Sequence, residues 1–175
     1  MPLRPAPDAA VASSALPDKP TKERTSLTPL QFGLARALPP LWKKANNRHL
    51  TAREQHKKML ELVIWVAGKH GCTAKQRVPV QYWRDHVKKD GQIDLQLIDA
   101  AGSPALLIEL DWTRNSGSVL KLQAGSLSKT PVLWISGVTA STKDDAKQLR
   151  AFANEVAGKP TGWWLPLFHL EHGWL

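Results

Sequence analysis

The sequence predicts a single α/β domain in which a mixed central sheet is flanked by helices. Three observations favour this class: an amphipathic helical pattern over about residues 51–68, alternating and then continuous apolar segments within 92–112, and a second helix–strand–helix pattern up to about residue 157. The predicted order is helix, three strands, helix, strand, helix. A chain of 175 residues with 42% hydrophobic residues is long enough for one such core.

The first third of the chain divides into two segments before this domain. Residues 1–25 are rich in Pro, Ala and Ser and are expected to form a disordered leader. Residues 26–48 are expected to be a basic linker or a short helix, which Pro39-Pro40 would end. The α/β domain is assigned to residues 49–175, and its Trp-rich C-terminal tail is expected to pack on the core.

The first helix of the domain has a clear start signal. Thr51 followed by Glu54 is a capping box, and apolar residues then recur at helical spacing up to about residue 68. The opposite side of this helix is expected to be exposed and basic; it carries Arg53, His56, Lys57 and Lys58.

Three strands are expected next. Residues 77–83 have strand composition, and the Lys88–Gly91 segment is expected to supply the turn into an alternating strand over 92–99. Residues 100–104 form the next turn. The nearly continuous apolar run over 105–112 is typical of a central strand that is buried on both faces.

The remaining elements follow the same reasoning. Residues 118–127 are expected to be a helix, residues 131–136 a short buried strand, and residues 142–157 a helix with apolar residues along one side.

The charge of the chain indicates its class of partner, and its cysteine content indicates its cellular compartment. The chain has 24 basic and 15 acidic residues, a formal charge of +9, and most of its basic residues lie before residue 91. This balance favours nucleic acid as a partner, although a solvated basic surface is an equally open interpretation. The single cysteine fits a reducing cytoplasm, and no apolar run is long enough for a membrane span. The candidate nucleic-acid contacts are Lys57, Lys58, Arg84, Lys88, Lys89, Arg114 and Asn115.

Three carboxylates are expected to meet at the ends of two adjacent strands. Glu109 and Asp111 share one face of the buried strand, and Asp94 can approach them from the preceding strand. Burying such charge is unfavourable unless a cation neutralises it, and Mg²⁺ or Mn²⁺ suits oxygen ligands. The alternative is that Asp94 and Asp111 border turns and that Glu109 pairs with a basic residue. Glu61 is a further candidate ligand from the first helix.

The order of these residues resembles the PD-(D/E)XK nuclease superfamily, which has the restriction-endonuclease-like fold. The similarity covers about residues 50–136. It implies that Asp94 is the metal-binding aspartate and Glu109 the first acidic residue of the (D/E)XK motif. Asp111 stands where that motif has lysine. Some members supply the lysine from the following helix, so the resemblance suggests Lys121; the alternatives are a third metal ligand at Asp111 with no lysine, or a degenerate site.

These expectations together describe a small Mg²⁺- or Mn²⁺-dependent nuclease or DNA-processing protein. Asp94, Glu109, Asp111 and Lys121 would form its catalytic site, and DNA rather than RNA is the expected substrate. The alternative is a catalytically inactive nucleic-acid-binding or interaction module of the same fold, such as a phage or mobile element encodes. A homodimer or a larger protein complex stays open.

Overall fold

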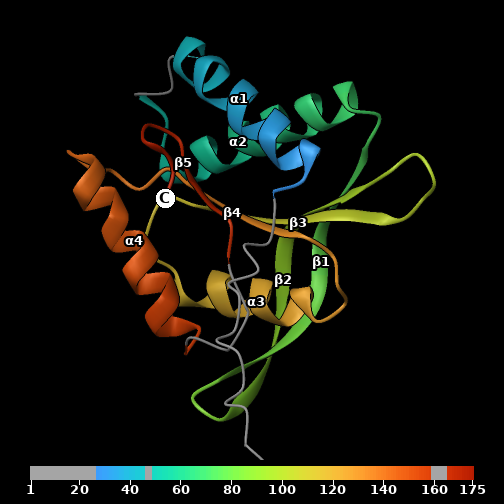
Figure 1. Ribbon diagram of the computed structural model, residues 1–175, viewed down its shortest axis with the longest axis vertical. Coiled ribbons are helices and arrows are strands. Elements are labelled where there is room, and N and C mark those ends of the chain that lie inside the picture. Colours follow the sequence, from blue (N-terminus) through green and yellow to red (C-terminus); the bar gives the residue numbers. More distant parts are fainter. Residues whose placement is uncertain (1–26, 46–48, 159–164) are drawn as a thin grey trace, which may run out of the picture.

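The computed structural model describes residues 27–45, 49–158 and 165–175, so the expected leader lies outside the described residues. Within these ranges the chain is an α/β protein with a mixed six-stranded sheet and four helices (Figure 1). The helices are α1 (Pro29–Lys44), α2 (Ala52–Lys69), α3 (Ser116–Ser126) and α4 (Lys143–Val156). The strands are β1 (Thr73–Arg84), β2 (Val87–Ile98), β3 (Pro104–Asp111), β4 (Val132–Ser136), β5 (Leu167–His169) and β6 (Gly173–Trp174).

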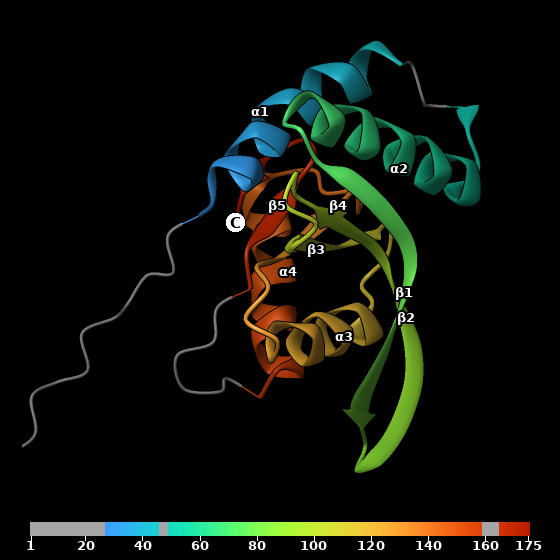
Figure 2. The same cartoon turned by 90° about the vertical axis from the view of Figure 1, so that its right-hand side faces the viewer.

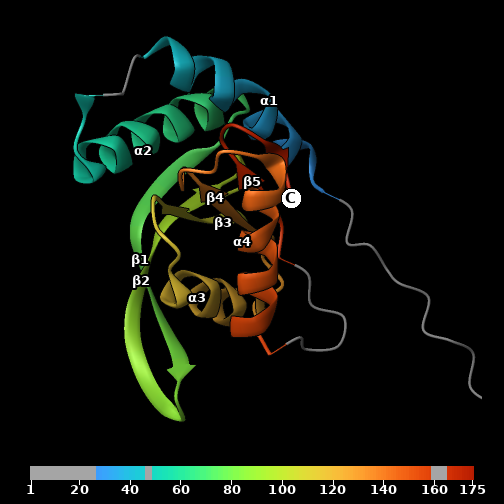
Figure 3. The same cartoon turned by 90° about the vertical axis from the view of Figure 1, so that its left-hand side faces the viewer.

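The sheet follows the chain order from β1 to β6. Strands β1, β2 and β3 are antiparallel neighbours, whereas β3, β4 and β5 run parallel, and β6 returns antiparallel to β5. Helices α1 and α2 lie together on one side of β3 and β4, and α3 and α4 lie on the other (Figures 2 and 3). Each side has its own apolar cluster, so β3 is covered on both faces, as its continuous apolar run predicts.

Helix α1 contradicts the expectation that Pro39-Pro40 ends it. The helix starts at a Thr28 capping box and continues through both prolines to Lys44. Each proline removes one backbone hydrogen bond. Burial of Leu34 and Leu38 against the core shared with α2 stabilises the helical path in spite of that loss.

The hairpin between β1 and β2 also differs from expectation. The turn lies at Asp85 and His86, both with positive φ, and Lys88–Gly91 belongs to β2. Asp and His tolerate the left-handed conformation better than most residues, and two such residues make the tight turn that suits a twisted ribbon. The ribbon is therefore longer than the sequence pattern indicated.

None of the helices in the described ranges has the length and apolar character needed to cross a membrane.

Candidate functional site

The candidate site lies where β2 separates from β3. The last paired residues are Leu95 and Ile108, and Asp94 is the next residue of β2 toward the hairpin. Its Oδ2 accepts a hydrogen bond of 2.9 Å from the Leu110 backbone N–H. In return, the Asp94 backbone N–H donates to Glu109 Oε1 over 3.2 Å. Two carboxylates thus bridge the opening between the strands. Asp94 lies inside β2 rather than at its end, which corrects the expected position.

Helix α3 brings two further groups to this opening. Ser118 and Lys121 are three residues apart and so share one side of the helix. Ser118 Oγ donates to Glu109 Oε2 over 2.8 Å, and Lys121 Nζ lies 2.8 Å from each Glu109 carboxylate oxygen. Lys121 also donates to the Gln92 backbone carbonyl over 2.8 Å. The lysine suggested by the resemblance therefore contacts the acidic residue that it would serve.

Helix α2 contributes His56, which the sequence pattern placed on an exposed face. His56 is half-buried; its Nε2 lies 3.6 Å from Asp94 Oδ1, and its ring packs against Trp112. Trp112 in turn contacts Trp42 of α1. The signal was present in the sequence, since His56 is three residues before the buried Met59 and thus shares its side of the helix.

Burial sets the electrostatics of the two carboxylates. Desolvation is the largest effect on Glu109; together with the neighbouring Asp94 charge it raises the pKa of Glu109 to about 7, against the opposing effects of Lys121 and Ser118. Desolvation also raises the pKa of Asp94, although the Leu110 N–H, His56 and Lys121 favour its charged form. One lysine contact therefore leaves this pair short of positive charge.

Asp111 is buried but engaged elsewhere. Its Oδ2 accepts a 2.7 Å hydrogen bond from the Trp134 indole N–H, and its Oδ1 accepts one of 3.1 Å from Asn115. Its charge still reaches Asp94, whose pKa it helps to raise. Asp111 thus adds negative charge near Asp94, while its own carboxylate oxygens accept hydrogen bonds from Trp134 of β4 and from Asn115, the N-cap of α3.

Glu61 is not brought to the carboxylate pair. It lies on the exposed side of α2, and its side chain is 3.6 Å from Lys58. An ion pair one turn apart on a helix surface accounts for it.

The candidate nucleic-acid contacts fall into three groups. Lys57 and Lys58 lie on α2, and Arg84, Lys88 and Lys89 are exposed near the β1–β2 turn. Arg114 is exposed in the loop after β3 and donates to Gln148 Oε1. Asn115 is exposed but caps α3 and bonds Asp111, which gives it a structural role.

The fit of a divalent cation depends on how many carboxylates can serve it. Among the described residues, no three His, Cys, Asp or Glu side chains form a group that could hold a metal ion. Mg²⁺, however, is usually bound through one or two carboxylates and keeps several waters. Asp94 and Glu109 match that pattern because they are hard oxygen ligands, adjacent, and incompletely neutralised. The residues therefore fit a two-carboxylate cation site and do not fit the expected three-carboxylate cage.

Comparisons with protein-family models, with curated proteins and with solved structures found no match to this chain.

Proposed function

We propose that the protein is a divalent-cation-dependent phosphodiester hydrolase that acts on DNA, of the restriction-endonuclease-like class. The observation that carries this proposal is the contact of buried Glu109 with Asp94 and with Lys121 at the opening between β2 and β3. The run of a helix, three strands, a helix and a strand from α2 to β4 supports it.

Each residue of the site has a role in this proposal. Asp94 and Glu109 would hold Mg²⁺ or Mn²⁺, and the bound cation would supply Lewis-acid stabilisation of the phosphate and activation of water. Lys121 would leave Glu109 when the cation binds, and its ammonium would then stabilise negative charge on the phosphate. Ser118 would keep hold of the Glu109 carboxylate, and His56 would hold Asp94 in position.

The single cysteine of the chain is consistent with action in a reducing cytoplasm.

A cleavage assay tests the proposal. Purified protein is incubated with supercoiled and linear DNA, and with RNA, in Mg²⁺ or Mn²⁺. We expect DNA cleavage that Asp94→Asn abolishes and that Lys121→Ala lowers by about 100-fold or more. Lys143→Ala is the matched control, since Lys143 is an exposed lysine on α4. Wild-type protein that cleaves no better than Asp94→Asn would refute the enzymatic proposal.

A second candidate function is a non-catalytic nucleic-acid-binding module. The engagement of Asp111 by Trp134 and Asn115 favours it, because among the described residues of the site only Asp94 and Glu109 then serve a cation. Such a module would bind DNA with a strong salt dependence and no cation requirement. Mn²⁺ titration of wild type and Glu109→Ala separates the two functions.

A further inference from the structure

The β1–β2 hairpin forms a long two-stranded ribbon that runs from the site into solvent. Its strands pair from Thr73–Ile98 to Arg84–Val87, interrupted at Arg77 and Asp94, whereas β3 supports β2 only from Leu95 onward. All three views show the turn end of the ribbon projecting beyond α3 (Figures 1 to 3). Lys88 lies six positions before Asp94 in β2, which at about 3.3 Å per residue is a reach of about 20 Å.

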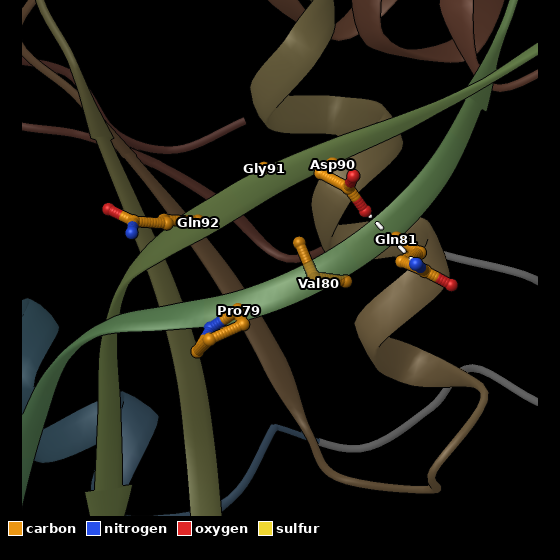
Figure 4. Close-up of a pocket in the computed structure, with 6 residues that line it drawn as sticks. All are labelled: Pro79, Val80, Gln81, Asp90, Gly91 and Gln92. Atoms are coloured by element: carbon orange, nitrogen blue, oxygen red, sulfur yellow. Dashed lines mark hydrogen bonds between the residues drawn. The ribbon is translucent and has the colours of Figure 1, made fainter.

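One face of this ribbon is mostly polar and borders a hollow. Directly opposed residues share a face, so three cross-strand pairs line it: Pro79–Gln92, Gln81–Asp90 and Trp83–Lys88. The first two pairs, together with the Val80–Gly91 pair between them, line a hollow of about 570 Å³ (Figure 4). Gln81 Nε2 donates to Asp90 Oδ1 over 3.0 Å, and the Gln92 amide stands apart from both in the same view. We name the surface formed by the three cross-strand pairs Pro79–Gln92, Gln81–Asp90 and Trp83–Lys88 the ribbon face.

The end of the ribbon combines apolar and basic side chains. Trp83 is 64% exposed and Val87 is 50% exposed, although both are large hydrophobic residues. Arg84, Lys88 and Lys89 are exposed beside them. Exposed apolar groups among cations suit a partner that has negative charge and flat apolar surfaces, and nucleic acid has both.

The free edge of β1 does not suit strand addition by a second copy of the chain. Pro79 lacks the N–H that a new strand would need, and Arg77, at φ 54°, interrupts the regular edge. The broad surface of the ribbon, rather than its edge, is therefore available to a partner.

We propose that the β1–β2 ribbon is a DNA-binding arm that lies in the major groove of duplex DNA, with the ribbon face toward the bases. The inference rests on the proposed function and names its substrate as duplex DNA. The B-form major groove is about 12 Å wide and admits a two-stranded ribbon, whereas the A-form groove of RNA is too narrow and deep. Gln81 and Gln92 match the adenine edge, and Asp90 matches the cytosine amine. Arg84 and Lys89, which lie outside the ribbon face, and Lys88, at the turn end of that face, would contact the phosphates.

A shortened arm tests this assignment. Tyr82 and Lys89 face each other across the ribbon, so Asn-Gly can replace Trp83–Lys88, all of which are exposed, as a two-residue turn. Binding of fluorescent DNA and RNA duplexes is measured by anisotropy in EDTA over a series of salt concentrations. We expect the full-length chain with the shortened arm to lose about 10-fold or more in affinity for duplex DNA, and the wild type to prefer DNA to duplex RNA.

Point variants separate the parts of the arm and guard against misfolding of the shortened chain. Lys88→Gln with Lys89→Gln should lower the salt slope by about 2, because each phosphate contact contributes about 0.9. Trp83→Ala should weaken binding at an unchanged slope. The matched control is Lys143→Gln with Lys147→Gln, which removes the same charge from the exposed surface of α4.

The outcomes that would overturn the arm are distinct from those that would overturn the function. If the shortened arm and the point variants bind DNA as tightly as the wild type does, the ribbon is not a DNA-binding arm. The nuclease proposal would be unaffected by that result. Duplex RNA bound as tightly as DNA would overturn the groove assignment. If the wild type binds neither duplex DNA nor duplex RNA, both the proposed function and the DNA-binding arm are refuted.

Discussion

Replacing Glu109 by Gln is expected to make the cation-free protein more stable than the wild type at alkaline pH. Glu109 is almost fully buried, at 2% exposure, and its charge is offset by the Lys121 ammonium and by hydrogen bonds from Ser118 and from the Asp94 backbone N–H. Gln keeps the size and oxygen of the side chain and removes the charge. Residues that serve a bound ligand commonly lower stability in its absence, because their charge lacks the partner it was selected for.

The size of the effect follows from the pKa. Burial raises the pKa of Glu109 from its ordinary value of 4.5 to about 7. At about 1.4 kcal/mol per pKa unit, the ionised carboxylate lowers the free energy of unfolding by about 3 kcal/mol above pH 7. Loss of the Lys121 ion pair in the variant offsets part of this gain, so the measured difference will be smaller.

The raised pKa of Glu109 determines how the stability of the protein depends on pH. A carboxyl group with a higher pKa in the folded state binds a proton more tightly in the folded protein than in the unfolded chain. Its contribution to the free energy of unfolding therefore falls as the pH rises from about 4.5 through about 7. Urea unfolding of wild type and Glu109→Gln in EDTA, at about pH 5 and about pH 8.5, measures this. From about pH 5 to about pH 8.5, the free energy of unfolding of the variant should rise by about 1 to 3 kcal/mol relative to that of the wild type.

A constant difference between the two proteins across this pH range would refute the reasoning, because it would mean that Glu109 titrates at an ordinary pKa. Glu54→Gln is the control carboxylate: Glu54 is exposed in the α2 capping box, and hydrogen bonds from Thr51 lower its pKa, so its pH dependence has the opposite sign.

Three further perturbations test other parts of the structure. Burial lowers the pKa of His169, so acidification below about pH 6.5 should lower the melting temperature as the unfolded chain takes up the proton first. Trp134→Phe should lower the free energy of unfolding by about 1 to 3 kcal/mol in urea, because it leaves buried Asp111 without its indole donor. Gly91→Ala would place a Cβ 2.8 Å from Cε1 of the Tyr82 ring and 3.2 Å from Cδ of Lys121, so both side chains must shift and cleavage should fall; Gly68→Ala, whose Cβ meets nothing within 4 Å, should leave cleavage unchanged.

Much of the fold could be predicted from local signals. The Thr51 capping box and the apolar spacing after it gave α2, and the uninterrupted apolar run gave β3, because both patterns are read over neighbouring residues. The path of α1 through Pro39 could not be predicted in this way, since it depends on contacts with a helix that follows it in the chain. The place of the ribbon turn depended on the backbone angles at Asp85, which composition does not specify.

Local sequence patterns likewise predict only part of the candidate site. The order of Asp94 and Glu109 on two neighbouring strands predicts that they meet, and the structure places them side by side. The engagement of Asp111 depends on Trp134, 23 residues further along the chain, and no local pattern announces that bond. The basic neighbours of His56 indicate a solvated helix face, whereas its spacing of three residues from buried Met59 places it toward the core, where the structure has it.

The most direct test of the proposed cation site is an anomalous difference map from crystals of the protein soaked in Mn²⁺. A site held by the Asp94 and Glu109 carboxylates predicts one strong peak in contact with both, with the Lys121 ammonium displaced from Glu109. The absence of a peak between these carboxylates, at Mn²⁺ concentrations that support cleavage, would contradict the account.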